Sequence, residues 1–145
     1  MKVVVDLNVL LDVVQKRDKF YFSSAVVLEA VVEKKVHGFI PAHLITTLYY
    51  LTARHSSKEN ADLLIQWILT HCEIGAESRQ EFLTAIQLGF PDFEDAVVAG
   101  VAKSHQCEFI ITRNIKDFKN SPVQAMTPEE FIVQFLQHNA DGHVL

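Results

Sequence analysis

The stretch Val3-Val4-Val5-Asp6-Leu7-Asn8 decides the fold of this chain of 145 residues. Three consecutive β-branched residues predict a short, buried strand of a parallel sheet. Asp6 ends that strand, and open α/β sheets bind their ligands beyond the carboxyl ends of their strands. Because a carboxylate buried there without a partner would be costly, we expect Asp6 to face a metal ion or a hydrogen-bond network.

Strand and helix signals alternate along the rest of the chain, and this alternation favours an α/β fold with a mostly parallel sheet. Further strands are predicted at 38–40, 72–74, 109–112 and 123–126. Helices are predicted at 8–14, 20–35, 44–54, 78–88, 93–105 and 127–138. Asn8 is expected to cap the first of them. A further helix is predicted to begin at a capping box of Ser56 and Glu59 and to end near residue 71.

Composition indicates one domain, which we place at residues 1–138 with a tail at 139–145. Apolar residues make up 49% of the chain, and the net charge of −5 argues against a protein that coats nucleic acid by bulk electrostatics. Cys72 and Cys107 lack the spacing of a zinc or disulfide motif, so we expect reduced cysteines in a cytoplasmic protein. No signal peptide is evident, and no apolar run is long enough to span a membrane.

Two further acidic segments are expected to lie near Asp6, at the same edge of the sheet. One is Asp92-Phe93-Glu94-Asp95 at a helix start, and the other is Asn114 with Asp117 just after the fourth predicted strand. Carboxylates from the ends of different strands converge at one edge of a parallel sheet. Since Mg²⁺ and Mn²⁺ prefer oxygen ligands, we expect a divalent-metal site there.

Each of these acids also has a purely structural explanation. Asp92 is suited to cap the helix that starts at Phe93, with Asp95 as a partner that favours the helix dipole. Asp117 is a common type of turn residue. Asp12, one helical turn beyond Asn8, is interpreted as a solvated residue or as a partner of the site rather than a ligand.

Three motifs together resemble the PIN domain, the fold of many ribonucleases and of the toxins of VapBC toxin–antitoxin pairs. They are Val-Asp-Leu-Asn-Val-Leu-Leu-Asp at 5–12, Asp-Phe-Glu-Asp-Ala at 92–96 and Ile-Ile-Thr-Arg-Asn-Ile-Lys-Asp-Phe at 110–118. The resemblance covers the chain from residue 3 to about 135. It implies a three-layer αβα sandwich whose central, mostly parallel sheet has four to five strands.

The resemblance also implies a pocket of three or four acids that binds Mg²⁺ or Mn²⁺. The first acid falls on Asp6, the third on Asp95, and the fourth position on Asn114, with Asp117 beside it. These four are the expected catalytic residues. Asp92 joins Asp6, Asp95 and Asn114 as an expected metal ligand.

One position departs from the family pattern. PIN nucleases usually carry a glutamate in the helix after the second strand, and here Thr47, or alternatively Thr46, occupies that place. A hydroxyl is a neutral and weaker metal ligand, so Asp92 would have to compensate. We therefore expect Thr47 and Asn8 to contact substrate, together with Arg113 and Lys116, although ordinary solvated charge also explains the two basic residues.

The sequence thus predicts a metal-dependent endoribonuclease that cleaves RNA phosphodiester bonds as the toxin of a toxin–antitoxin pair. The alternative is a catalytically impaired PIN-like module that binds RNA or a partner protein without cutting. Expected partners are RNA, an antitoxin protein and a second copy of the chain. The homodimer is expected to use apolar residues of two early helices: Val26, Val27, Leu28, Val31, Val32, Leu44, Leu48, Tyr49 and Leu51.

Overall fold

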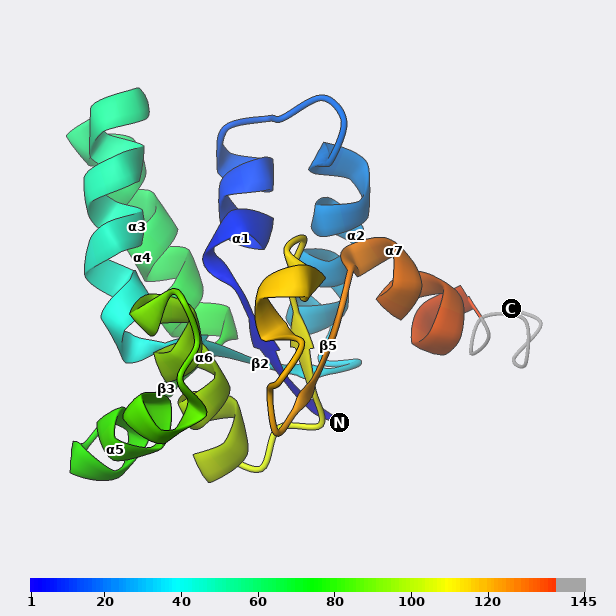
Figure 1. Cartoon of the computed structure of the whole chain (residues 1–145). Helices are drawn as coiled ribbons and strands as arrows, with labels where there is room; N and C mark the ends of the chain where they lie inside the picture. Colours follow the sequence, from blue (N-terminus) through cyan, green and yellow to red (C-terminus); the bar gives the residue numbers. More distant parts are fainter. Residues whose placement is uncertain (138–145) are drawn as a thin grey trace.

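A five-stranded parallel sheet with the strand order β3-β2-β1-β4-β5 forms the centre of the molecule (Figure 1). The structure, a computed structural model, describes residues 1–137. The strands are β1 (Lys2–Val5), β2 (His37–Pro41), β3 (Glu73–Gly75), β4 (Phe109–Ile111) and β5 (Gln124–Met126). The predicted α/β class and the parallel sheet are confirmed.

Strand β1 lies in the middle of the sheet, as its apolar sequence predicts. Val3 pairs in register with Gly38 of β2 on one side and with Phe109 of β4 on the other. Val3, Val4 and Val5 are all completely buried, because β1 is covered on both faces and both edges. Asp6 therefore leaves the sheet at the centre of its carboxyl edge.

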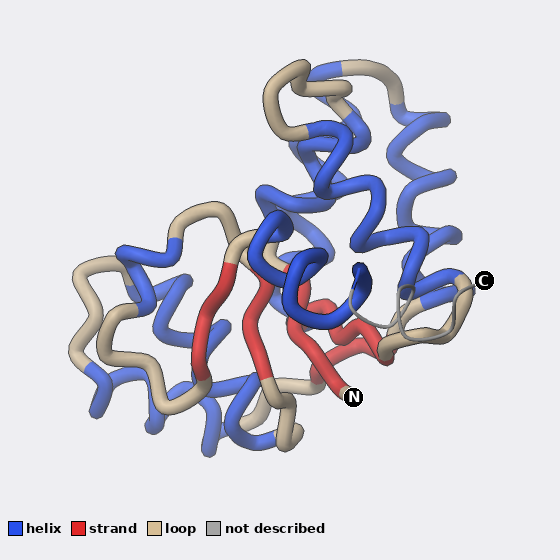
Figure 2. Tube along the Cα trace, turned by 90° about the vertical axis from the view of Figure 1, so that its right-hand side faces the viewer, coloured by secondary structure: helices blue, strands red, loops and turns tan. Residues whose placement is uncertain are grey.

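Helices cover both sides of the sheet, as the tube view shows (Figure 2). The segments are α1 (Leu7–Val14), α2 (Tyr21–Val32), α3 (Ala42–His55), α4 (Lys58–His71), α5 (Arg79–Leu88), α6 (Phe93–Ser104), η1 (Ile115–Phe118), α7 (Pro128–Phe131) and η2 (Ile132–Gln137). Helices α1 to α4 pack in neighbouring pairs, and α5 packs on α6.

The chain reverses its direction of winding between β1 and β4. It passes from β1 to β2 and β3 at one edge, then crosses back to β4 and continues to β5 at the other. Right-handed crossovers put α1–α4 on one face and α5–α6 on the opposite one. The gap between the ends of β1 and β4 is therefore a topological switch point, where doubly wound sheets bind their ligands.

Several helix starts differ from the predictions by one or two residues. Asp6 rather than Asn8 caps α1, and Ser57 rather than Ser56 caps α4, where its side chain accepts from the N–H of Asn60. The predicted capping boxes that begin at Ser78 and Thr127 are confirmed. The predicted tail at 139–145 lies outside the described residues.

The apolar residues expected to form a dimer surface mostly lie inside the molecule. Five of them, Val27, Leu28, Val31, Leu44 and Leu48, belong to the buried core. The expectation that these five side chains are exposed is wrong, because α2 and α3 pack on a sheet that needs a continuous apolar cover. None of the helices at residues 1–137 is both long enough and apolar enough to cross a membrane.

Candidate functional site

Asp6 is buried, and both of its carboxylate oxygens accept hydrogen bonds. Oδ1 accepts from the backbone N–H of Leu7 at 2.8 Å, and Oδ2 accepts from the hydroxyl of Thr112 at 2.8 Å. Burial raises the pKa of Asp6, and these two hydrogen bonds oppose the rise. The helix start and the neighbouring strand thus hold this carboxylate in one orientation.

Thr112 connects the two strands of the switch point. It follows β4, is completely buried, and accepts from the N–H of Asn114 at 3.1 Å while it donates to Asp6. Asn8 lies across from it: its Oδ1 accepts from the N–H of Arg113 at 3.2 Å, and its Nδ2 is 3.4 Å from Thr112 Oγ1. Asn8, expected to bind substrate, therefore also bridges α1 to the segment after β4.

The α6 acids surround Asp95, the second central carboxylate. Asp92 caps α6, with its Oδ1 accepting from the N–H of Asp95 at 3.2 Å, so the capping explanation of Asp92 holds. Burial raises the pKa of Asp95 to about 7, and the charges of Asp6, Asp92, Asp117 and Glu94 add to the rise. Acids from three separate segments of the chain thus act on Asp95.

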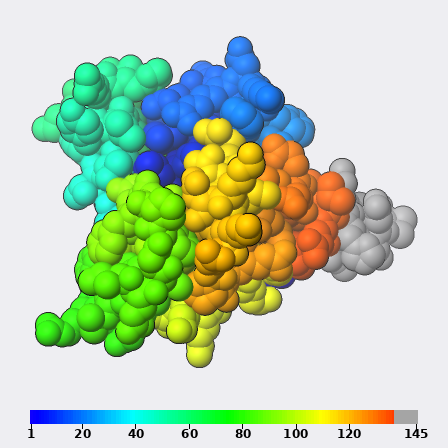
Figure 3. Space-filling view, in the orientation of Figure 1, coloured from blue at the N-terminus to red at the C-terminus, as the bar shows by residue number. Residues whose placement is uncertain are grey.

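A hollow in the surface marks the place where these segments meet. In the space-filling view, blue atoms of the segment after β1 lie between cyan atoms of α3, green atoms around the start of α6 and yellow atoms after β4 (Figure 3). Asn114, Asp117 and Glu94 are exposed. Glu94 also raises the pKa of Asp6. Glu94 is not among the ligands predicted from the sequence, although it belongs to the acidic segment 92–95.

Thr47 lies on α3, one helical turn after His43, so the two side chains project from the same face. Nδ1 of His43 pairs with Glu77, which follows β3. Nε2 of the same ring is buried and has no hydrogen-bond partner in the part of the chain that the structure describes. His43 belongs to α3, which begins directly after β2, the strand next to β1.

Arg113 forms an ion pair with the buried Asp12, so its side chain does not extend freely from the edge of the site. Its Nε donates to Asp12 Oδ2 at 2.9 Å, and its guanidinium lies 4.1 Å from the centre of the Phe20 ring. Asp12 is completely buried and also accepts from the hydroxyl of Ser24 at 2.8 Å. The interpretation of Asp12 as a solvated residue is wrong, because its charge is neutralised internally.

Lys116 is exposed and borders a small cavity of about 210 Å³. The cavity lies between the turn before α6 and the segment after β4, and Asp117 and Lys119 also line it. Of the basic residues near the site, Lys116 and Lys119 are thus the ones available to a phosphate in solution.

The oxygen donors of this site fit a hard divalent cation. Mg²⁺ keeps several waters and needs only one or two protein carboxylates, a requirement that Asp6 and Asp95 meet. Within residues 1–137, no three His, Cys, Asp or Glu side chains are already arranged to hold an ion together. The unpartnered Nε2 of His43 is a further donor atom in this region.

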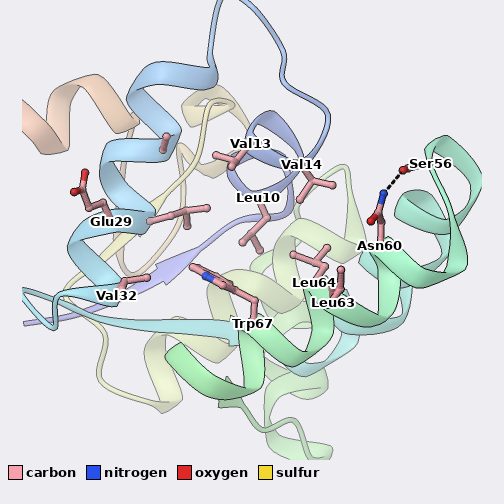
Figure 4. Close-up of a pocket in the computed structure, with 12 residues that line it drawn as sticks. Leu10, Val13, Val14, Glu29, Val32, Ser56, Asn60, Leu63, Leu64 and Trp67 are labelled. Atoms are coloured by element: carbon pink, nitrogen blue, oxygen red, sulfur yellow. Dashed lines mark hydrogen bonds between the residues drawn. The ribbon is translucent and has the colours of Figure 1, made fainter.

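A separate, apolar groove of about 580 Å³ lies between α1, α2 and α4. Leu10, Val13 and Val14 of α1 face Leu64 and Trp67 of α4 across it, with Val32 of α2 at one side (Figure 4). Leu63, on its border, is 60% exposed. This groove has the character of a binding surface for an apolar segment rather than of a catalytic pocket.

The fold and the acidic edge define a nuclease-like PIN architecture, and comparison with known proteins agrees. The model of the PIN domain family matches residues 2–116. The chain therefore belongs to the PIN domain family, as its three motifs predicted.

Several proteins named VapC or VapBC are similar to this chain. The chain is 30% identical over 135 residues to "Ribonuclease VapC1" of Aquifex aeolicus, covering 90% of this chain and 92% of that protein. Its fold is similar to VapBC2 of Rickettsia felis bound to a promoter DNA fragment (TM-score 0.69, 19% identity, 88% of this chain and 98% of that chain). It is also similar to DNA-bound VapBC of Salmonella typhimurium (TM-score 0.68, 15% identity, 88% and 98%).

The raised pKa of Asp95 predicts a specific pH dependence of stability in metal-free protein. An unfolded aspartate loses its proton near pH 3.9, whereas folded Asp95 keeps it until about pH 7, so stability falls as the pH rises between these values. Asp95→Asn removes the ionisation and, after allowance for partial exposure, should stabilise the protein by about 1–2 kcal/mol at pH 8 and by little at pH 4. Urea unfolding of both proteins at the two pH values checks this, and an equal effect at both would contradict it.

Proposed function

We propose that this protein is a metal-dependent endoribonuclease, the toxin of a toxin–antitoxin pair, and that it cleaves RNA phosphodiester bonds. The observation that carries the proposal is the presence of two carboxylates at the switch point of a PIN-family sheet, where the charge of Asp6 contributes to the raised pKa of Asp95. The relative named Ribonuclease VapC1 supports the choice of reaction. RNA cleavage that depends on a divalent ion tests it.

In this proposal Asp6 and Asp95 hold the ion, and Asn114, Asp117 and Asp92 complete the site directly or through water. A bound Mg²⁺ or Mn²⁺ supplies a Lewis acid that offsets charge developing on the phosphate and activates a water. The protein orients the carboxylates that would hold the ion. Thr112 and the start of α1 fix Asp6, and Asp92 fixes the first turn of α6, so that little reorganisation is needed when substrate binds.

The RNA backbone is proposed to lie along Lys116 and Lys119, beside the acids. Arg113 and Asn8 act mainly by shaping this rim, because their polar groups are already engaged with Asp12 and with the backbone after β4. Thr47 is proposed to border the site from α3, on the other side. Contacts of this kind position a strand without reading its sequence.

The alternative function, an RNA- or protein-binding module without activity, is favoured by one observation, the threonine at position 47. The two proposals differ in their response to Mn²⁺. Residual cleavage in Mn²⁺ that disappears in Asp6→Asn supports the enzyme, and RNA binding without any cleavage supports the module.

Thr47→Glu is expected to strengthen Mg²⁺ binding roughly tenfold, because it adds a charged oxygen to a site that lacks one. Thr46→Glu, at the exposed neighbouring position, is the matched control and should change the affinity little. Calorimetric titration of the three proteins with Mg²⁺ decides. An unchanged affinity in Thr47→Glu would mean that position 47 does not reach the ion.

We further propose that an antitoxin protein covers the apolar groove between α1, α2 and α4. Its size and lining suit the apolar face of a helix, and the VapBC assemblies among the structural neighbours support a partner of this kind. A cytoplasmic location, expected from the two free cysteines, completes the proposal.

A homodimer also remains part of the proposal, although the buried residues named above cannot form its surface. Exposed apolar side chains occur instead on α5 and at the start of α6, where Phe82, Leu83, Ile86 and Phe93 are 40%, 45%, 67% and 50% exposed. Light scattering at micromolar concentration is expected to give twice the 16.4 kDa mass of one chain. A mass near that of a single chain would contradict the dimer.

A further inference from the structure

His43 occupies a place that the family pattern leaves unexplained. It lies in the first turn of α3, immediately after β2, and β2 is the neighbour of β1 in the sheet. It therefore stands at the same carboxyl edge as Asp6. It also precedes Thr47 by one helical turn, so both residues lie on the same face of α3.

The ring is oriented by a carboxylate on its far side. Glu77 follows β3, the next strand outward, and pairs with Nδ1 of His43, while the side chains of His43 and Glu77 are only 18% and 7% exposed. When a carboxylate accepts from Nδ1–H of a neutral imidazole, the lone pair resides on Nε2. A histidine arranged in this way, with a carboxylate behind it, is the usual form of a metal-ligating histidine.

The other ring nitrogen is the unusual feature. Nε2 of His43 is buried and has no hydrogen-bond partner among residues 1–137, a rare condition for a polar atom in a folded protein. A buried site accommodates a single ion more readily than a phosphate group. The observations therefore favour a metal ion over a substrate atom as the missing partner.

We propose that Nε2 of His43 is a ligand of the divalent ion and takes the place of the carboxylate that Thr47 does not provide. This inference rests on the proposed metal-dependent function. Since no three candidate ligands already surround one point within residues 1–137, side chains must move toward the ion when it binds. A nitrogen ligand favours Mn²⁺ over Mg²⁺, so the site should be selective for Mn²⁺.

The test is direct binding of each metal to the whole protein, with no activity readout. In wild type, pulsed electron paramagnetic resonance of bound Mn²⁺ should show coupling to a nitrogen nucleus. His43→Ala should lose that coupling and weaken Mn²⁺ binding by about tenfold or more, while Mg²⁺ affinity falls only about threefold or less. Glu77→Gln keeps the ring but loses its orientation and should weaken Mn²⁺ binding by a smaller factor.

His71→Ala is the control, because His71 ends α4 at the opposite edge of the sheet and its ring packs at a tilt against Trp67, with the ring centres 5.3 Å apart. Mn²⁺ binding that depends on Asp6, shows no nitrogen coupling in wild type and is unchanged in His43→Ala would overturn the role of His43 and leave the metal site intact. Absence of any Mn²⁺ binding in wild type would overturn both the role of His43 and the proposed function. The wild-type spectrum gives this answer even if His43→Ala does not fold.

Discussion

Asp6→Asn is expected to reduce RNA cleavage by about 10²–10⁴-fold, because a charged metal ligand worth several kcal/mol of transition-state stabilisation is lost. The variant should still fold, although the amide keeps only one oxygen to accept from Leu7 or Thr112. Burial raises the pKa of Asp6, so the neutral amide avoids the cost of burying a charge. Cleavage of a labelled RNA in Mn²⁺, measured beside thermal unfolding, separates loss of function from loss of fold.

Glu108→Gln is the matched control for this substitution. Glu108 is an exposed carboxylate directly before β4, at the opposite, amino edge of the same sheet. It should retain wild-type cleavage. Equal losses in Asp6→Asn and Glu108→Gln would indicate a nonspecific effect of net charge and would remove Asp6 from the site.

The largest expected effect on stability comes from Asp12→Ala. Asp12 is completely buried and accepts from Arg113 and Ser24, with Arg17 at 3.5 Å as a second cation. Its removal leaves the Arg113 guanidinium without its anion beside the core, a kind of loss that typically costs 3–5 kcal/mol. We expect about 3 kcal/mol by urea unfolding, because Arg113 is partly exposed and regains some hydration.

Glu33→Ala provides the comparison for an ion pair at the surface. Glu33 and Lys35 are 3.3 Å apart, but their side chains are 45% and 61% exposed. The expected cost is below about 1 kcal/mol. If Asp12→Ala is as mild as Glu33→Ala, the Asp12 network does not hold α1, α2 and the segment after β4 together.

Short-range sequence patterns predicted the central strand, the functional edge of the sheet and several helix starts. The β-branched run and the aspartate after it predicted the central strand and the edge at which the acids gather. The capping boxes at Ser78 and Thr127 were readable because both partners lie within four residues of each other. Asp95 was identifiable for the same reason, as part of a compact acidic motif at a helix start.

The side-chain contacts within and beside the site could not be predicted from the sequence, because they join distant parts of the chain. Arg113 meets Asp12 across 101 positions, Thr112 meets Asp6 across 106, and Glu77 meets His43 across 34. Nothing in the sequence around Asp12 indicates a buried residue, since its partners are supplied by tertiary packing. The cap of α1 was misplaced on Asn8 because either residue type caps a helix, and the hydrogen bond to Leu7 selects Asp6.

One measurement tests the central claim most directly: cleavage of a defined single-stranded RNA by the purified wild-type protein, with and without a divalent ion. We predict cleavage in Mn²⁺, weaker cleavage in Mg²⁺, none after chelation, and products that carry a 5′-phosphate and a 3′-hydroxyl. Cleavage that persists in excess chelator would contradict a metal-dependent endoribonuclease. So would an RNA that stays intact in Mn²⁺ although the protein is folded and binds that RNA.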